Sequence, residues 1–187
     1  LVQEIAVSLY RNPEVGLAEA FASRKLAALL EAEGFAVEAG LAGMPTAFRA
    51  VRGSGGPAIA FLAEYDALPA IGHGCGHNLI AACSTAAVLA CSRVVPPGRP
   101  VRWQLVGTPA EETVGGKIAM VQDGVFADVD AALIAHPGRR HSLGGRSWAS
   151  HPFELTFRGR AAHAGSGPQE GINALDALVA AYLQIRN

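Results

Sequence analysis

Apolar residues in this chain follow the spacing of helices in some segments and run without interruption in others. Leu1, Ile5 and Leu9 recur every four residues, which predicts a first helix. The segments 58–63 and 131–135 are instead short, unbroken apolar runs, as is typical of strands inside a parallel sheet. The same criteria predict further helices at 21–33, 79–93 and 115–123 and further strands at 35–39, 46–52 and 101–106.

The order of these elements predicts the class of the fold. Strands alternate with helices, which indicates an α/β domain with a mostly parallel sheet flanked by helices. The character of the chain changes near Gly145: residues 151–158 alternate like a strand, and residues 172–185 have the spacing of an amphipathic helix. Because one strand and one helix cannot bury a core alone, we expect residues 1–145 to form one domain and 146–187 to begin a second, incomplete α+β domain.

Composition limits the compartment and the partners. Half of the 187 residues are apolar and the formal net charge is −1, which argues against nucleic acid or an anionic membrane surface as the main partner. The longest apolar stretch, 79–91, is too short to span a bilayer, and we expect no signal peptide. Three cysteines suit a reducing compartment, so we expect a cytoplasmic protein. We interpret Cys83 and Cys91 as buried, small hydrophobic residues of a helix.

The loop at 73–78, His-Gly-Cys-Gly-His-Asn, is the most informative stretch of the chain. It follows Glu64 and Asp66 and places the thiol of Cys75 two residues from the imidazole of His77. Its glycines allow tight turns, so neighbouring side chains can point at one centre. Thiolate, imidazole and carboxylate groups are the ligands that a zinc-type divalent ion prefers, so this stretch predicts a metal site.

Further candidate ligands follow two other predicted strands. Glu111 and Glu112 come after the strand at 101–106, and His136 comes directly after the strand at 131–135. In an open parallel sheet, ligands bind beyond the carboxyl ends of the strands. We therefore expect these groups to converge on one cleft with the thiol and imidazole of the glycine-rich loop.

Each of these residues also has a simpler interpretation. Adjacent acids such as Glu111 and Glu112 are usually a solvated pair, and a lone histidine such as His136 is more often structural. Asp66 could merely cap a turn. The simpler interpretation is kept for His141 and His151, whereas the joint pattern of the other residues favours a metal site.

Taken in order, the motifs resemble those of the aminoacylase-type metallopeptidases, the M20 amidohydrolases. The motifs are His-x-Cys-Gly-His at 73–77, Gly-Thr-Pro-Ala-Glu-Glu at 107–112, His-Pro at 136–137, Ala-His-Ala at 162–164 and Gly-x-Asn-Ala at 171–174. The family contains aminobenzoyl-glutamate hydrolases, indole-acetyl-amino-acid hydrolases and aminoacylase-like dipeptidases. The resemblance covers essentially the whole chain and implies a zinc-peptidase-like catalytic domain followed by a lid and dimerisation domain.

The resemblance also implies a role for each candidate residue. Glu111 would be the general base and proton shuttle, and His163, in the lid, would stabilise the oxyanion in the active site of a partner subunit. Asp66 and His73 would orient the ligands, and Asn173 would contact the substrate. The implied metal ligands are Cys75, which binds or bridges metal, and His77, Glu112 and His136.

The implied activity is that of a metal-dependent amidohydrolase that carries two divalent ions, zinc or manganese. With metal-activated water, it would cleave an amide whose leaving group is an amino acid with a free carboxylate. N-acyl amino acids, dipeptides and aminobenzoyl-glutamate-like compounds meet that description. The resemblance further implies a homodimer that forms through the lid.

Two departures from the family pattern stand out. Glu64 occupies a place where other members carry a metal-binding histidine, which fits the cysteine-containing branch, and we do not count it as a ligand. The chain also ends inside the lid, at Asn187. We therefore expect a truncated chain that lacks the last metal-binding histidine of the family.

Two other functions are compatible with the same residues. A hydrolase could use Cys75 as a nucleophile with His77 as its base, and a chelator would then have no effect. Alternatively, a truncated relative on the same fold could bind a ligand or regulate without catalysis. Ligand binding without hydrolysis in the presence of added metal would indicate this second function.

Overall fold

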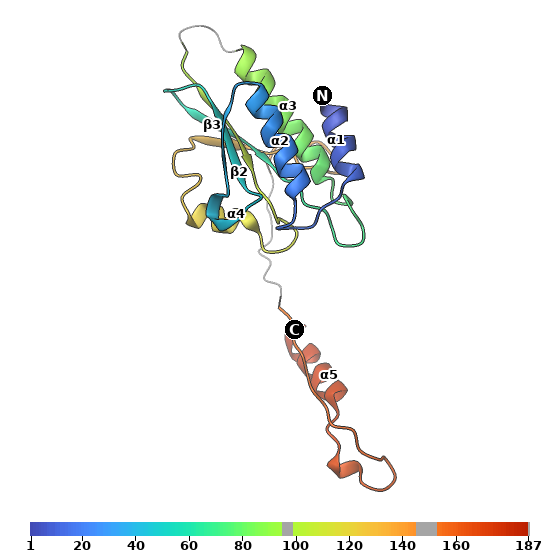
Figure 1. Cartoon of the computed structure of the whole chain (residues 1–187). Helices are drawn as coiled ribbons and strands as arrows, with labels where there is room; N and C mark the ends of the chain where they lie inside the picture. Colours follow the sequence, from blue (N-terminus) through green and yellow to red (C-terminus); the bar gives the residue numbers. More distant parts are fainter. Residues whose placement is uncertain (95–98, 145–152, 187) are drawn as a thin grey trace. The chain divides into compact units, whose positions relative to one another are not determined.

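The computed structural model describes residues 1–94, 99–144 and 153–186. The chain divides into two units, Leu1–His141 and Ser142–Asn187 (Figure 1). Within the described ranges, no helix has both the length and the apolarity needed to cross a bilayer.

The first unit is built on a five-stranded sheet in the order β1-β2-β4-β3-β5. β3 pairs in parallel with β4 and β5, whereas β2 is antiparallel to both β1 and β4. The predicted helix-flanked α/β sheet is confirmed, with its parallel half formed by β3, β4 and β5 and an antiparallel half that makes the sheet mixed. The strands are β1 (Ala36–Ala39), β2 (Phe48–Arg52), β3 (Ala58–Ala63), β4 (Arg102–Gly107) and β5 (Ala131–Leu133).

Helices cover both faces of this sheet. The helices α1, α2 and α3 lie along one face, and α4 lies on the other face near a short 3-10 turn, η1 (Figure 1). α3 begins at His77, two residues before the predicted start, so the predicted ligand His77 is part of its first turn. The bounds are α1 (Val2–Arg11), α2 (Ala20–Ala32), η1 (Leu41–Gly43), α3 (His77–Val94) and α4 (Gly116–Gln122).

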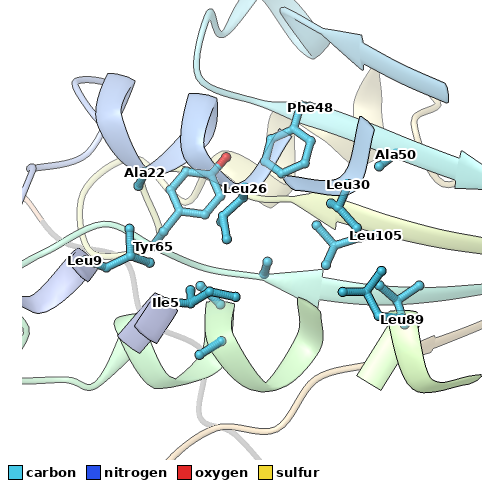
Figure 2. Packing of buried hydrophobic residues seen from close by; sticks show 14 of the residues in the cluster. Ile5, Leu9, Ala22, Leu26, Leu30, Phe48, Ala50, Tyr65, Leu89 and Leu105 are labelled. Carbon is cyan, nitrogen blue, oxygen red and sulfur yellow. The ribbon is translucent and has the colours of Figure 1, made fainter. Parts of the chain in front are cut away.

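The larger core fills the space between the sheet and the three helices on its first face. Figure 2 shows apolar side chains from α1, α2 and α3 meeting those of β2 and β4. Burial of this apolar surface fixes the helices against the sheet. It therefore holds the ends of β3 and β4 in a constant position. The fully buried residues include Leu9, Leu26, Leu30, Phe48, Tyr65 and Leu105.

Tyr65 in this core predicts a loss of stability at alkaline pH. Burial, reinforced by the negative charges of Glu19 and Asp66, raises the pKa of Tyr65 well above its ordinary value. The pKa of Tyr65 is therefore higher in the folded than in the unfolded protein. The contribution of the protonated Tyr65 to the free energy of unfolding is complete below about pH 10, and it is lost as the pH rises further. Between about pH 9 and pH 11, the free energy of unfolding should fall by about 1.4 kcal/mol through this group.

Urea denaturation at both pH values measures this effect. At the lower pH, Tyr65→Phe should be less stable than the parent protein, because the Tyr65 hydroxyl donates a 2.5 Å hydrogen bond to the Thr46 carbonyl, but it should lack the alkaline decrease. Tyr10→Phe, at an exposed tyrosine, is the control and should keep the decrease. An equal alkaline decrease in Tyr65→Phe and the parent protein would contradict the prediction.

Two predictions of burial are wrong for the described residues. Cys83 is exposed and Cys91 is only half-buried, because α3 packs one side against the sheet and turns the stripe that carries Leu79 and Cys83 outward. β5 is exposed along its length, because in the described part of the chain it lies at the edge of the sheet with β3 as its one partner.

In its described part, the second unit contains a 3-10 turn, η2 (Pro168–Glu170), and one helix, α5 (Ala174–Ile185). The prediction of a strand is wrong for residues 153–158, which pair with no neighbouring strand, and residues 151 and 152 lie outside the described ranges. Among the described residues of this unit, none is buried.

Candidate metal centre

His77 lies at the middle of the candidate site. Its side chain is fully buried, and Nδ1 lies 2.9 Å from Asp66 Oδ1 and 3.0 Å from the Asp66 carbonyl oxygen. Two acceptors at Nδ1 require a proton there, which leaves a lone pair on Nε2. Nε2 is buried and has no hydrogen-bond partner among the described residues. The carboxylate therefore orients an imidazole that presents a free ligand atom.

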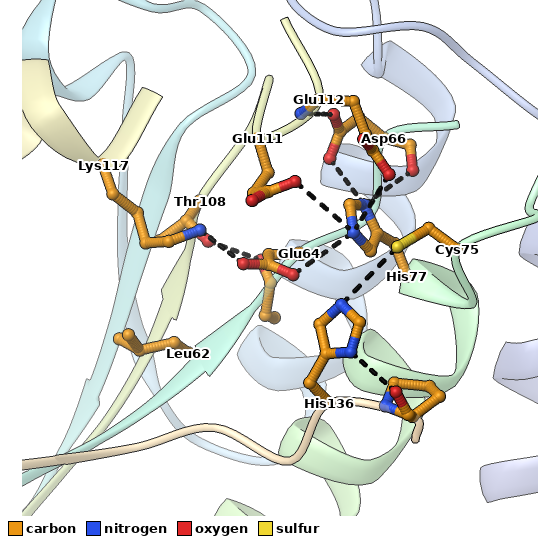
Figure 3. A network of polar contacts seen from close by, with 12 residues as sticks. Leu62, Glu64, Asp66, Cys75, His77, Thr108, Glu111, Glu112, Lys117 and His136 are labelled. Atoms are coloured by element: carbon orange, nitrogen blue, oxygen red, sulfur yellow. Dashed lines mark hydrogen bonds and ion pairs between the residues drawn. The ribbon is translucent and has the colours of Figure 1, made fainter. Parts of the chain in front are cut away.

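Three carboxylates surround the free nitrogen of His77 (Figure 3). Glu64 Oε2 lies 3.4 Å from Nε2, Glu112 Oε1 lies 3.7 Å away, and Glu111 Oε2 lies 3.8 Å away. The Glu64 and Glu112 oxygens are buried and, like Nε2, lack a hydrogen-bond partner in the described structure. Buried polar atoms without a partner reduce the stability of the fold. A cation placed between Nε2 and these two carboxylate oxygens would satisfy all three atoms at once.

A thiol and a second imidazole complete the group on the other side of His77. Cys75 Sγ lies 3.5 Å from His136 Nε2, and the His136 Nδ1 contacts the Pro137 carbonyl oxygen at 2.8 Å. Nδ1 is thus the donor of this ring, and Nε2 faces the site. Two sets of potential ligands share His77, and within each set the ligand atoms lie within 4.8 Å of one another. One set is Cys75, His77 and His136, and the other is His77, Glu111 and Glu112.

The parallel half of the sheet brings these residues together. β3 and β4 end side by side, with Ala63 opposite Gly107, and β5 lies on the other side of β3. The segments that leave these strands carry the acids and His136 to one edge, as the positions at the strand ends predict. The structure thus brings Cys75, His77, Glu111, Glu112 and His136 to one place.

Gly76 allows the closest approach in this group. Its φ is +84°, a left-handed conformation that residues with a side chain rarely adopt. A Cβ at this position would lie 2.9 Å from Pro137 Cγ. Glycine is therefore needed for the loop of Cys75 and His77 to pack against the segment that carries His136.

The negative charge of the site acts on the Cys75 thiol. Burial, followed by a hydrogen bond to Glu112 and the charges of Glu112, Glu111 and Glu64, raises the pKa of Cys75 to about 11. At neutral pH and without a cation, the thiol stays protonated and is a poor nucleophile. Because a metal ligand must be the thiolate, cation binding would release this proton.

The Asp66–His77 pair shows the same preference for positive charge. Burial opposes the charged form of His77, but the hydrogen bond to Asp66 and the charges of Asp66, Glu64 and Glu112 outweigh it and raise its pKa. Burial would raise the pKa of Asp66, yet the hydrogen bonds from His77 and from the Glu112 backbone lower it. The site is therefore a partly buried anionic cluster that favours a cation.

The sequence pattern places Glu64 at this edge but does not predict its contacts, and it does not predict Lys117 at all. Glu64 is not counted as a ligand there, yet its buried carboxylate lies between His77 and the Lys117 ammonium, with which it forms an ion pair (Figure 3). The position of Glu64 at the end of a strand is a usable signal. Lys117 lies in the first turn of α4, and no motif marks it.

For three predicted residues, no described contact links the side chain to this cluster. His73 makes no described hydrogen bond to a candidate ligand, and burial lowers its pKa. It lines a cavity of about 460 Å³ that also contacts Tyr10 and Ile71. His163 and Asn173 belong to the second unit, where His163 Nδ1 accepts a hydrogen bond from the Gly165 N–H and Asn173 caps α5. The roles assigned to these three residues stay predictions.

Comparisons with known proteins agree on the family. No family model matches the chain. The Xaa-Arg dipeptidase of Homo sapiens is 39% identical over 193 residues, which cover 94% of this chain and 44% of the relative. The Xaa-Arg dipeptidase of Mus musculus is 44% identical over 155 residues (76% of this chain, 36% of the relative). One of the subunits of the p-aminobenzoyl-glutamate hydrolase of Escherichia coli (strain K12) is 37% identical over 194 residues (94% of this chain, 40% of the relative).

Solved structures share the fold. A dinuclear metal-binding peptidase of the M20 family from Bacillus subtilis superposes with a TM-score of 0.62 at 22% identity, over 70% of this chain and 40% of that protein. An aminobenzoyl-glutamate utilization protein from Klebsiella pneumoniae superposes with a TM-score of 0.59 at 21% identity, over 70% of this chain and 42% of that protein.

The chain belongs to the M20 family of amidohydrolases, as its motifs indicate. It spans between 36% and 44% of the length of the relatives described above.

Proposed function

We propose that the protein is a metal-dependent amidohydrolase that hydrolyses the amide bond of small substrates with metal-activated water. The observation that carries the proposal is the convergence of buried polar atoms without hydrogen-bond partners on one point beside the sheet: His77 Nε2, Glu64 Oε2 and Glu112 Oε1. Because the chain spans less than half of its relatives' length, the proposal concerns the whole protein.

The donor set fits divalent ions. A thiol, two imidazoles and a carboxylate suit zinc best, and manganese is the alternative that the family resemblance adds. The residues that would hold two ions are Cys75, His77, Glu112 and His136. Bound divalent ions supply Lewis-acid chemistry, because they polarise a carbonyl and lower the pKa of water. Asp66 orients His77 for this purpose through its bond to Nδ1.

The two adjacent glutamates, Glu111 and Glu112, have different roles in the proposed reaction. The Glu112 side chain is 20% exposed, and its backbone N–H donates a 3.0 Å hydrogen bond to Asp66, which suits a fixed ligand. The Glu111 side chain is 41% exposed, although its carboxylate reaches the same centre. We assign Glu111 as the general base, because a base must meet both the attacking water and the substrate. Glu111 takes the proton from water and passes it to the departing nitrogen.

The resemblance supplies the finer details of the proposal. The substrate is an amide whose leaving group is an amino acid with a free carboxylate, such as a dipeptide, an N-acyl amino acid or an aminobenzoyl-glutamate-like compound. We further propose that the protein is a cytoplasmic homodimer formed through the region after residue 145. In that dimer His163 stabilises the oxyanion in the partner's site and Asn173 contacts the substrate.

A hydrolysis assay on the whole protein tests the proposed function. The substrates are an Xaa-Arg dipeptide, p-aminobenzoyl-glutamate and an N-acyl amino acid, each with added zinc or manganese. We expect release of the free amino acid from at least one of them. Hydrolysis should stop when a chelator removes the metal and return when metal is restored.

Two outcomes of this assay contradict the proposal. Hydrolysis that resists a chelator and is abolished in Cys75→Ser would identify a thiol nucleophile, which the raised pKa of Cys75 disfavours. Binding of these compounds without hydrolysis in any added metal would identify a non-catalytic member of the family.

A further inference from the structure

We propose that Glu19, which is distant in sequence from the motifs of the site, is a positioning residue. Glu19 fixes the backbone from which Glu111 reaches the metal centre. The inference rests on the proposed function, in which Glu111 is the general base. Glu19 lies at the N-terminal end of α2, and its side chain is fully buried.

The carboxylate of Glu19 bonds directly to the residue before Glu111. Glu19 Oε1 accepts a 2.8 Å hydrogen bond from the Ala110 N–H, and Glu19 Oε2 accepts one of 2.8 Å from the Thr46 hydroxyl. Thr46 is held in turn, because its carbonyl accepts the hydrogen bond from the Tyr65 hydroxyl. Both oxygens of the buried carboxylate are thus occupied, and one of them is bonded to the loop of the two glutamates.

The loop needs this support, because its backbone is strained at Ala110. The φ of Ala110 is +58°, which lies in the left-handed region that residues other than glycine avoid. Such a conformation persists only where its surroundings hold it. The bond from the Ala110 N–H to Glu19 is one restraint, and the bonds from the Gly115 and Gly116 N–H groups to the Ala110 carbonyl are others.

Close packing of the preceding segment adds to the effect. A Cβ on Gly16 would lie 2.9 Å from Ala110 Cα and 2.5 Å from Thr113 Oγ1, so the chain before α2 lies directly against the loop. The loop is anchored on its other side by Asp66, which accepts a hydrogen bond from the Glu112 N–H.

Glu111 therefore stands between two anchored backbone amides. Its own carboxylate makes no hydrogen bond to another described residue and approaches His77 Nε2 at 3.8 Å. This arrangement suits a group that must transfer protons, because its side chain is free while its backbone is fixed. A small displacement of such a group can lower the rate by about 10²-fold.

Glu14 provides a matched control in the same segment. Its carboxylate accepts hydrogen bonds from the Phe21 and Ala22 N–H groups and so caps α2. It makes no described side-chain contact with the loop at 110–112. Glu14→Gln therefore tests for general loosening of α2 without loss of the contact to Ala110.

The test compares Glu19→Met, which removes the acceptor but keeps the volume, with Glu19→Gln, which keeps an oxygen acceptor. The first readout is hydrogen exchange of the Ala110 amide, measured by NMR on the metal-loaded protein. The second is kcat and KM of the whole enzyme. In Glu19→Met we expect faster exchange at Ala110 and a fall in kcat of about 10²-fold. KM and metal content should be unchanged.

Two comparisons separate positioning from general stability. Glu19→Gln should restore most of the kcat and the slow exchange at Ala110, whereas Glu14→Gln should leave both unchanged. If Glu19→Met does not fold, Glu19→Asp replaces it, because the shorter side chain withdraws the acceptor and should also speed exchange at Ala110.

The inference is wrong if Glu19→Met, or Glu19→Asp in its place, folds and shows the same hydrogen exchange at Ala110 as the parent protein. A kcat equal to that of the parent would also overturn it. A parent protein that hydrolyses none of the amides overturns the proposed function instead. In that case the exchange readout still decides whether Glu19 holds the loop.

Discussion

Glu111→Gln is expected to lower kcat by about 10²- to 10⁴-fold, the usual contribution of general acid–base catalysis. The amide of glutamine has nearly the same shape as the carboxylate but cannot accept a proton from water. Metal content should be unchanged, because Glu111 is the more exposed of the two glutamates and is not assigned as a ligand. Steady-state kinetics together with elemental analysis of the purified variant measures both quantities.

Glu112→Gln and Glu4→Gln are the controls for this prediction. Glu112→Gln should lose metal affinity, because the oxygen at the centre of the site is replaced by a weaker ligand. Glu4→Gln, on α1, should behave like the parent protein in both assays. A Glu111→Gln protein that has lost its metal, or one that retains full kcat, would show that the roles of the two glutamates are wrongly assigned.

His77→Ala is expected to abolish the stabilisation that metal gives to the fold. A ligand present at about 1,000 times its Kd stabilises the native state by about 4 kcal/mol, and His77 is shared by both sets of potential ligands. Its loss also removes the hydrogen bond to the buried Asp66 carboxylate, a change that typically costs about 1.5–3 kcal/mol. Thermal unfolding with and without zinc separates these effects.

The exposed residue His141 gives the matched histidine control. His141→Ala should keep the full rise in unfolding temperature on addition of zinc, and His77→Ala should show no such rise. If zinc stabilises His77→Ala as much as the parent protein, the ion binds elsewhere, and the assignment of the centre is incorrect.

The positions of the site residues follow from sequence pattern where local rules decide them. The unbroken apolar run at 58–63 coincides with β3, and the turn residues and acids that follow it mark the end of a strand. Because ligands gather at the carboxyl ends of parallel strands, the sequence alone predicts that Glu111, Glu112 and His136 lie beside the Cys75 loop.

Other features depend on contacts that no local pattern contains. The ion pair of Lys117 with Glu64 joins residues 53 positions apart, and the bond from Ala110 to Glu19 joins residues 91 positions apart. The sequence shows Glu19 only as an acid near a helix start. Its role emerges from burial and from the left-handed backbone of Ala110, which alanine itself does not predict.

Burial is predicted least well where packing partners decide it. The apolar spacing of α3 does not reveal which stripe faces solvent, so the sequence predicts a buried Cys83 although this residue is exposed. The alternation at 153–158 has the period of a strand, but a strand also requires a neighbour to accept its hydrogen bonds.

The most direct test of the metal centre is a titration of the metal-free protein with cobalt(II), followed by absorption spectroscopy. Cobalt(II) reports a thiolate ligand through a charge-transfer band in the near ultraviolet. We predict that the band appears in the parent protein and in Cys83→Ser, and that it is absent in Cys75→Ser. A parent protein that binds cobalt without this band, or a Cys75→Ser protein that retains it, would contradict a centre built on Cys75.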